Sequence, residues 1–579
     1  MKRCPECRRD YYDDTLLYCL DDGNALLEGP ASVDEPATAI LSEPPAVAGG
    51  LTQPTAILGE PATAIFPRTE AEPQVKLGNS TKRQSLSAHR AAKPLAALIA
   101  VVLILAGGFF AYRYFSPAKQ IESIAVMPFV NESGNADVEY LSDGMTETLI
   151  NSLSQIPNLS VKARSSVFRY KGKETHPQTI GRELNVQAIL NGRVIQRGEQ
   201  LTLGLELIDA KTENVIWSES YNRKQTDLVA LQSEIARDVS GKLKSKLSGA
   251  DEAKVTKTYT ANPEAYQLYL KGNFYTSKYT KEGLAKGIEY YNQAIAIDVN
   301  YALAYNGLAY NYIVADDWFL SPNDSMPKAR DAARRALEID ATLADAHTSL
   351  AVVLHWYDWD WAGAEKEFQR AIELNPNDPR TRQYYAWFLS EQVGRAEEAI
   401  AEGKKAQQLD PLSPEVNTFL GIVLSFARRS DQAVEQLRKT IELDPNYWLA
   451  RTCLGRAYEQ KGDINQAIAE YQRARQVEEN VPEPLALLGR AYALSGKKAE
   501  AEKAIDELKE LSKRTYVPPY NFAIVYAGLG NKDEAFAYLN RAYDDRSYYL
   551  AWLKVDSQLD SLRDDPRFKD LLKRMNLPE

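Results

Sequence analysis

The chain has 579 residues, of which 44% are hydrophobic, and its formal net charge is -10. This length allows several domains, each with a core of its own. The acidic balance argues against nucleic acid as a partner, because binding to phosphates needs a concentrated basic surface. Only four cysteines are present, Cys4, Cys7, Cys19 and Cys453, so a disulfide framework is excluded for the bulk of the chain.

The first 28 residues carry a pattern typical of zinc ribbons. Cys4 and Cys7 form a C-x-x-C pair, and Cys19 opens a second pair in which Asp22 stands in place of the fourth thiol. Zinc takes four tetrahedral ligands, and a carboxylate oxygen is an acceptable one. The spacing resembles the zinc ribbons at the N-termini of many bacterial membrane proteins. We expect structural zinc at these four residues, with Asp21 as an alternative ligand, or a degenerate ribbon without metal.

The next two segments differ sharply in composition. Residues 29–92 are rich in Pro, Ala, Ser, Thr and Glu, which predicts a disordered linker. Residues 93–115 contain an uncharged apolar run that predicts one transmembrane helix, with a buried core helix as the alternative. Basic residues are more frequent before this run than after it. The expected protein is therefore single-pass in the inner membrane, with a cytoplasmic N-terminus and periplasmic C-terminal domains. A homodimer through the membrane helix is conceivable.

Residues 121–248 predict a small α/β domain. A short apolar strand at 124–130 precedes an amphipathic helix whose apolar residues recur at four-residue steps. Residues 189–196 and 201–208 alternate in period two and predict a β-hairpin. A long helix with one apolar stripe, between 228 and 247, closes the domain.

A repeat dominates the C-terminal half, over residues 263–551. A usually small residue recurs at steps of 42, 35, 35, 34, 34, 34 and 34, at Ala294, Ala336, Ala371, Ala406, Thr440, Ala474, Leu508 and Ala542. A period of about 34 is typical of tetratricopeptide (TPR) helix pairs. Such pairs stack into a solenoid with a long concave face. We expect about eight repeats, followed by a capping helix over residues 552–579.

The predicted fold class is therefore a multidomain α plus α/β protein. A TPR α-solenoid of about eight helix pairs is preceded by a small α/β domain, one transmembrane helix and a zinc-ribbon-like module. The sixth repeat shows the full residue pattern, in Leu454, Gly455, Tyr458, Ala467, Tyr471 and Ala474. The adjacent Cys453 is expected to be a small packed residue and not a reactive thiol.

The helical register places seven side chains on the inner helices, facing the groove. They are Asn306, Tyr310, Trp356, Gln383, Trp387, Arg456 and Arg490. Aromatic residues and arginine are favoured in binding hot spots. These seven are the predicted contacts for a protein or peptide partner, and the alternative is that several of them pack between repeats.

Several phrases carry a family resemblance, including SIAVMPFVNESG and ILNGRVIQRGEQLTLGLELIDAKTENVIWSESY. They resemble the TolB amino-terminal-like domain of bacterial membrane-anchored TPR proteins, and the resemblance covers roughly residues 121–579. Its relatives are joined to adenylate cyclases, Ser/Thr kinases or winged-helix regulators through one membrane helix. The resemblance implies an exported sensing or scaffolding arm. It transfers no enzymatic activity, because no such segment precedes the predicted membrane helix.

Catalytic motifs are absent from the sequence. The four histidines, His89, His176, His347 and His355, form no metal-binding pair at helical spacing. No P-loop, dinucleotide-binding turn or nucleophile elbow is found. We therefore expect a scaffold or sensor at the cell envelope that is not an enzyme. The alternative is a small-solute receptor whose α/β domain binds the ligand and relays occupancy through the membrane helix to the cytoplasmic segment.

Overall fold

A computed structural model describes residues 2–3, 10–11, 27–28, 120–243, 247–316 and 319–577. Three two-residue strands belong to a first unit, Met1–Leu103. They are β1 (Lys2–Arg3), β2 (Asp10–Tyr11) and β3 (Leu27–Glu28), which pair antiparallel in the order β2-β1-β3. The other described residues belong to a second unit, Ile104–Glu579.

The expected location in the inner membrane is contradicted. A helix needs about 20 predominantly apolar residues to cross a bilayer. Across the described parts of the chain, no helix is both long enough and apolar enough to do so. The longest of these helices, α10 (Pro322–Ile339), has 18 residues and carries charges along its length. The predicted linker at 29–92 and the predicted span at 93–115 lie outside the described residues.

The α/β domain is built on a six-stranded sheet, in the order β6-β4-β7-β8-β9, with β5 also paired to β7. β4 lies parallel to both β6 and β7, whereas β7, β8 and β9 form antiparallel hairpins. The hairpin predicted from the alternating runs is confirmed as β7 and β8. The strands are β4 (Ser123–Val126), β5 (Val130–Asn131), β6 (Ser160–Val161), β7 (Ala188–Arg197), β8 (Gln200–Asp209) and β9 (Val215–Lys224).

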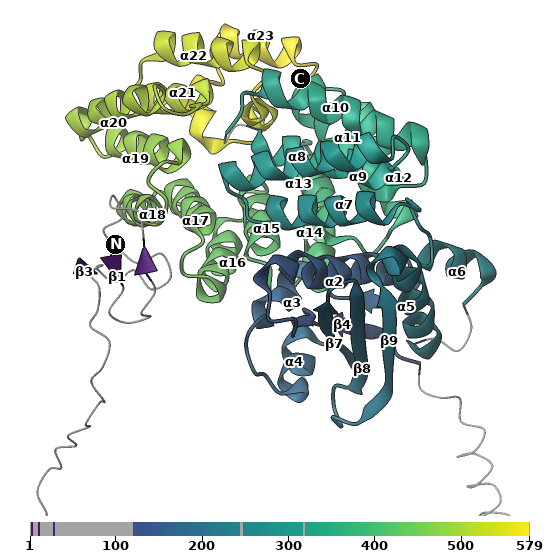
Figure 1. Ribbon diagram of the computed structural model, residues 1–579. Coiled ribbons are helices and arrows are strands. Elements are labelled where there is room, and N and C mark those ends of the chain that lie inside the picture. Colours follow the sequence, from purple (N-terminus) through teal and green to yellow (C-terminus); the bar gives the residue numbers. More distant parts are fainter. Residues whose placement is uncertain are drawn as a thin grey trace, which may run out of the picture. The chain divides into compact units, whose positions relative to one another are not determined.

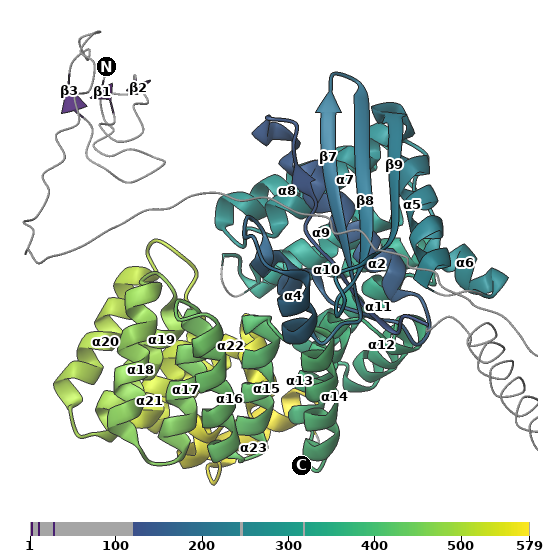
Figure 2. The same ribbon diagram turned by 90° about the horizontal axis from the view of Figure 1, so that it is seen from below.

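Helices complete this domain (Figure 2). α2 and α5 pack against each other and against strands of the sheet. The four-residue steps predicted for α2 are buried in the core, at Leu141, Met145, Leu149 and Leu153. The α-helices are α2 (Glu139–Ser154), α3 (Arg164–Val167), α4 (Pro177–Leu184), α5 (Leu228–Leu243) and α6 (Gly249–Val255).

Eight helix pairs follow and form the TPR solenoid (Figure 1). The first helices of the pairs are α7 (Pro263–Thr276), α9 (Ala302–Ala315), α11 (Ala344–Val353), α13 (Pro379–Ser390), α15 (Pro414–Phe426), α17 (Trp448–Gln460), α19 (Pro482–Leu494) and α21 (Pro519–Gly528). The second helices are α8 (Lys281–Ile297), α10, α12 (Trp361–Leu374), α14 (Ala396–Leu409), α16 (Ser430–Leu443), α18 (Ile464–Val477), α20 (Lys498–Leu511) and α22 (Lys532–Asp544).

The residues that revealed the repeat share one structural position. Each lies near the end of the second helix of its pair, and none is more than 1% exposed. In the sixth repeat, Gly455 on α17 lies against the ring of Tyr471 on α18. A Cβ at Gly455 would come within 2.3 Å of Tyr471 Cε1. Position 455 of α17 therefore requires a glycine, because the two helices of this pair approach too closely for a side chain there.

The C-terminal segment differs from the single capping helix expected over 552–579. It forms two 3-10 turns, η5 (Tyr548–Trp552) and η6 (Ser557–Leu562), and then α23 (Pro566–Arg574). The segment runs back to the early repeats. The Trp361 indole on α12 donates to the carbonyl of Met575 at 3.1 Å. The eighth repeat also makes such a contact, since Asn323 on α10 donates to the carbonyl of Asp544, the last residue of α22, at 3.2 Å. Figure 1 shows this yellow end beside α10.

The α/β domain is hydrogen-bonded to the C-terminal ends of two second helices of the repeats, α14 and α16. Lys162 Nζ donates to the carbonyl of Gln408 at 2.7 Å, and Arg169 Nη2 donates to that of Leu443 at 2.6 Å. Close packing adds to these bonds, since α2 meets α7 where Gly144 faces Leu270, and a Cβ there would lie 2.8 Å from Leu270 Cδ2. The α/β domain and the repeats therefore pack against each other through both hydrogen bonds and close contacts.

Candidate functional site

A cavity of about 750 Å³ lies inside the repeats. Its wall combines the first helices of successive repeats with α2 and α3 of the α/β domain and with the C-terminal turns η5 and η6. Ligand sites typically measure about 300–1,000 Å³ and tend to form where domains meet. This volume and this position make the cavity the candidate functional site.

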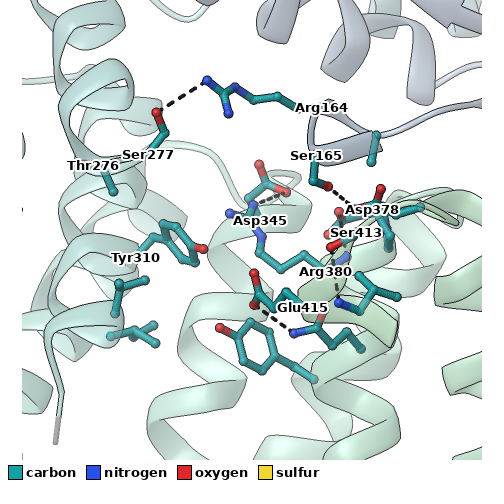
Figure 3. Close-up of a pocket in the computed structure, with 18 of the residues that line it drawn as sticks. Arg164, Ser165, Thr276, Ser277, Tyr310, Asp345, Asp378, Arg380, Ser413 and Glu415 are labelled. Atoms are coloured by element: carbon teal, nitrogen blue, oxygen red, sulfur yellow. Dashed lines mark hydrogen bonds and ion pairs between the residues drawn. The ribbon is translucent and has the colours of Figure 1, made fainter. Parts of the chain in front are cut away.

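Arg380 marks the centre of the polar wall (Figure 3). The side chain of Asp378 caps α13 and places Arg380 in its first turn. The guanidinium lies 3.5 Å from the carboxylate of Asp345, and its Cζ lies 4.5 Å from the ring centroid of Tyr310. Burial lowers the pKa of Arg380, but the charges of Asp345 and Asp378 outweigh this effect and hold the pKa well above its usual value. Arg380 is therefore a fixed cation.

Glu415 lies in the first turn of α15 and also lines the cavity. Gln383 Nε2 donates to its carboxylate at 3.1 Å. Burial raises the pKa of Glu415, and the charge of Asp410 raises it further. The hydrogen bond from Gln383 and the charge of Arg380 offset these effects only in part. The negative charge of this carboxylate is thus poorly solvated and only partly compensated by the groups around it.

Asp410 joins the α/β domain to this wall. Ser166 Oγ donates to its carboxylate at 2.5 Å, and Ser165 donates to the other oxygen. Burial raises the pKa of Asp410, and these two hydroxyl groups partly counter the effect. On the same side, Arg164 Nη2 donates to Ser277 Oγ at 3.4 Å. Figure 3 shows the contact between Arg164 and Ser277.

Six of the seven groove residues predicted from the sequence line the cavity. They are Asn306, Tyr310, Trp356, Gln383, Trp387 and Arg456. The seventh, Arg490, is not part of the lining, because its guanidinium pairs with Glu459 at 2.7 Å. Whether any of the seven contacts a partner stays a prediction.

Part of the expected groove is covered from within the chain. The ring of Trp356 stacks on that of Tyr548 with centroids 5.1 Å apart, and Trp387 meets Trp552 at 5.9 Å. Arg456 pairs with Glu483 at 3.1 Å and with Asp556 at 3.4 Å. The C-terminal segment therefore covers the aromatic end of the groove and forms part of the cavity wall there, while Arg380 lies in the polar part of the same cavity.

Sequence reasoning missed several of the central residues, namely Asp345, Arg380, Asp410, Glu415 and Tyr279. One signal could have indicated Tyr279. The turn inside a helix pair often holds a glycine in the left-handed region, at Gly394, Gly462, Gly496 and Gly530. The first repeat places Tyr279 there instead, with φ 51°. Aligning the eight turns would have shown a bulky residue where a glycine is favoured.

Two cysteine predictions have different outcomes. The predicted zinc ligands, Cys4, Cys7, Cys19 and Asp22, lie outside the described residues, so the zinc site stays a prediction. Cys453 is 4% exposed, and burial raises the pKa of its thiol. A buried thiol with a raised pKa is a poor nucleophile, which confirms its expected role as a packed residue.

Family comparisons match parts of the chain. A model described as the second domain of HilA/YgeH-like transcriptional regulators matches residues 119–238. Tetratricopeptide repeat models match residues 367–401, 420–482 and 454–513. None of these descriptions names a TolB-like domain, so that resemblance stays a prediction.

Two curated proteins are similar to parts of the chain. "Putative adenylate cyclase 3" of Rhizobium meliloti is 31% identical over 245 residues, which cover 42% of this chain and 41% of that protein. "Type IV pilus assembly protein PilF" of Pseudomonas aeruginosa is 39% identical over 88 residues, or 15% and 34% of the two chains. The chain thus spans less than half the length of these relatives. A solved structure of Pseudomonas aeruginosa pilF is 27% identical and covers 37% of this chain and 93% of that one, with a TM-score of 0.29.

The relative named as an adenylate cyclase contradicts the expectation that this chain is not an enzyme. That expectation rested on missing motifs, and a motif search finds only the chemistries whose signatures it includes. The repeat assignment is supported both by the family models and by the eight helix pairs. The chain therefore contains tetratricopeptide repeats, which form a helical solenoid.

Proposed function

We propose that this TPR protein is an interaction scaffold that holds an extended segment of a partner protein in its inner cavity. The observation that carries the proposal is the cavity of about 750 Å³ along the first helices of successive repeats. In TPR solenoids the stacked inner helices supply an extended concave binding surface. Because α3 and the C-terminal segment close parts of that surface, an extended chain fits better than a folded domain.

A photocrosslinking experiment tests this proposal on the full chain. A photoreactive amino acid replaces Gln383 in the cavity wall, or Val393, which is 74% exposed in the turn after α13. Each variant is mixed with an affinity-selected pool of random peptides. We expect peptide adducts at position 383 and few at position 393. Equal labelling at the two positions, or none at 383, contradicts the proposal.

A small solute is a second occupant for the same cavity. The sequence-based alternative placed the solute within the α/β domain, whereas the α/β domain supplies only part of the cavity wall. Its volume lies within the range of small-molecule sites. Mass spectrometry of metabolites retained by the purified full chain distinguishes the two readings, since a stoichiometric solute that blocks crosslinking at position 383 favours a receptor.

Adenylate cyclase activity is a second candidate function, favoured by the 31% identity to the Rhizobium meliloti protein. The test is formation of cyclic AMP from ATP and Mg²⁺ or Mn²⁺ by the full chain. Turnover above a heat-denatured control supports this activity, and its absence leaves the scaffold as the better proposal.

A further inference from the structure

The carboxylate of Glu415 faces the cavity without a paired cation. Within the described parts of the chain, its hydrogen-bond donor is the neutral amide of Gln383. Among the described residues, no lysine, arginine or histidine nitrogen lies within 4.0 Å of it. Arg380 is close enough for its charge to act on Glu415, but its guanidinium is engaged by Asp345 at 3.5 Å. A partly desolvated carboxylate of this kind favours an added positive charge.

Three tyrosines of the cavity wall are affected by the charge of this carboxylate. Burial, followed by the negative charge of Glu415, raises the pKa of Tyr310 and of Tyr447. Burial also raises the pKa of Tyr384, with Tyr310 and Glu415 as further causes. All three line the cavity. Each of the three phenols thus lies within electrostatic reach of the carboxylate, and aromatic faces attract cations.

A fourth tyrosine is held in place at the expense of backbone strain. Tyr279 adopts φ 51°, a region that a bulky residue rarely occupies. Its hydroxyl lies 3.0 Å from that of Tyr310, and its side chain lines the cavity while remaining 45% exposed. Trp359 and Arg428 adopt the same backbone region in the turns of the third and fifth repeats. It is therefore the contact with Tyr310 and the place in the cavity wall that link Tyr279 to this site.

We propose that Glu415 and the tyrosines Tyr279, Tyr310, Tyr384 and Tyr447 form a subsite for the cationic end of an arginine or lysine side chain. The proposal rests on the proposed function, because the side chain is carried by the bound peptide segment. The charge of the rest of the cavity wall supports this assignment, because its carboxylates outnumber its lysines and arginines. The net charge of -10 also favours a basic partner.

The test measures binding of defined peptides to the full chain by isothermal titration calorimetry. Three octapeptides alternate alanine with arginine, glutamine or glutamate, and spermidine serves as a free amine. We expect the arginine peptide to bind more tightly than the other two peptides and more tightly than spermidine. Glu415→Gln keeps the shape and removes the charge, and we expect it to weaken arginine-peptide binding at least tenfold.

Matched variants separate binding from folding. Glu373→Gln removes an exposed carboxylate of α12 that pairs with Arg370 outside the cavity, and should leave binding unchanged. Tyr310→Phe retains the ring and should retain binding, whereas Tyr310→Leu should lose it. Because Glu415 has no paired cation in the free chain, Glu415→Gln should also raise the melting temperature. Weaker binding together with higher stability cannot arise from misfolding.

The outcomes separate this inference from the proposed function. Binding of the glutamine or glutamate peptide as tight as that of the arginine peptide, unaffected by Glu415→Gln, overturns the cation subsite but leaves a peptide scaffold. Failure of all three peptides together with spermidine overturns both. Spermidine binding that is tighter than peptide binding and depends on Glu415 keeps the cation subsite and assigns it to a free amine.

Discussion

Ser166 on α3 donates its hydroxyl to the carboxylate of Asp410 at 2.5 Å, across 244 residues of sequence. Ser165 donates to the other oxygen of the same carboxylate. Ser166 Oγ in turn accepts the backbone N–H of Leu412 at 2.9 Å. Asp410 follows α14, so this cluster fastens the α/β domain to the boundary between the fourth and fifth repeats.

Asp410→Ala should therefore loosen the whole domain interface. It leaves two serine hydroxyls and the buried ammonium of Lys162 without the carboxylate, which should cost about 2–4 kcal/mol. The measurement is urea unfolding followed by circular dichroism, with hydrogen exchange across α3. Glu478→Ala is the control, because Glu478 holds the equivalent place after α18. Unchanged exchange in α3 would show that the cluster does not hold the domain.

Two helical glycines should respond in opposite ways to alanine. At Gly455 the new Cβ would lie 2.3 Å from Tyr471, so Gly455→Ala should destabilise the chain by about 1–3 kcal/mol. At Gly241 on α5 no atom lies within 4 Å of the new Cβ. Gly241→Ala should therefore stabilise the chain by about 0.5–1 kcal/mol, because alanine favours the helix. Thermal unfolding of both variants measures this, and equal effects would contradict the packing argument.

The repeats could be predicted because each position performs the same packing task in every pair. The residue near the end of each second helix is buried in every pair, from Ala294 to Ala542. Its regular recurrence is therefore visible in the sequence. The hairpin of β7 and β8 was equally accessible, because alternation along a strand reflects its two faces. Local pattern was thus enough to predict both the solenoid and this hairpin.

The cavity could not be predicted in the same way. Asp345, Arg380 and Glu415 lie on three different helices and meet only because the repeats stack. The aromatic cover from η5 was also hidden, since the contact between Tyr548 and Trp356 joins residues nearly 200 apart. Six of the seven predicted groove residues line the cavity. The sequence did not show which of them the C-terminal segment covers.

The pair of His347 and Glu367 should make stability depend on pH. Burial lowers the pKa of His347, but the carboxylate of Glu367 at 2.5 Å and the carbonyl of Ala341 outweigh it, so the pKa lies above its usual 6.5. A raised histidine pKa stabilises the fold fully below about pH 6.5, and the contribution disappears as pH rises through the folded-state pKa. His347→Gln should lose about 1 kcal/mol at pH 5.5 and much less at pH 9. His176→Gln is the control, and denaturation across this pH range is the measurement.

Trp552 should be important for the packing of the C-terminal segment against the inner helices of the repeats. Its ring meets Trp387 at 5.9 Å and Phe426 at 5.6 Å, and the Arg456 guanidinium lies 4.9 Å from its centroid. Trp552→Ala should cost about 3–5 kcal/mol, and Trp552→Phe clearly less. Guanidinium unfolding compares the two variants. An alanine variant as stable as the phenylalanine one would mean that η5 adds little to the fold.

Tyr279→Gly should separate backbone strain from ligand contact. A left-handed backbone costs a non-glycine residue about 1–2 kcal/mol, so glycine relieves strain while the bond to Tyr310 is lost. The two effects oppose each other, and the free energy of unfolding should change by less than about 1 kcal/mol. Gly462→Ala is the reverse control and should cost about 1 kcal/mol, because Gly462 has φ 81° at the equivalent turn. Urea unfolding measures both variants, and calorimetry with the arginine octapeptide should show weaker binding only for Tyr279→Gly. Full binding by that variant would mean that the strained tyrosine does not serve the cavity.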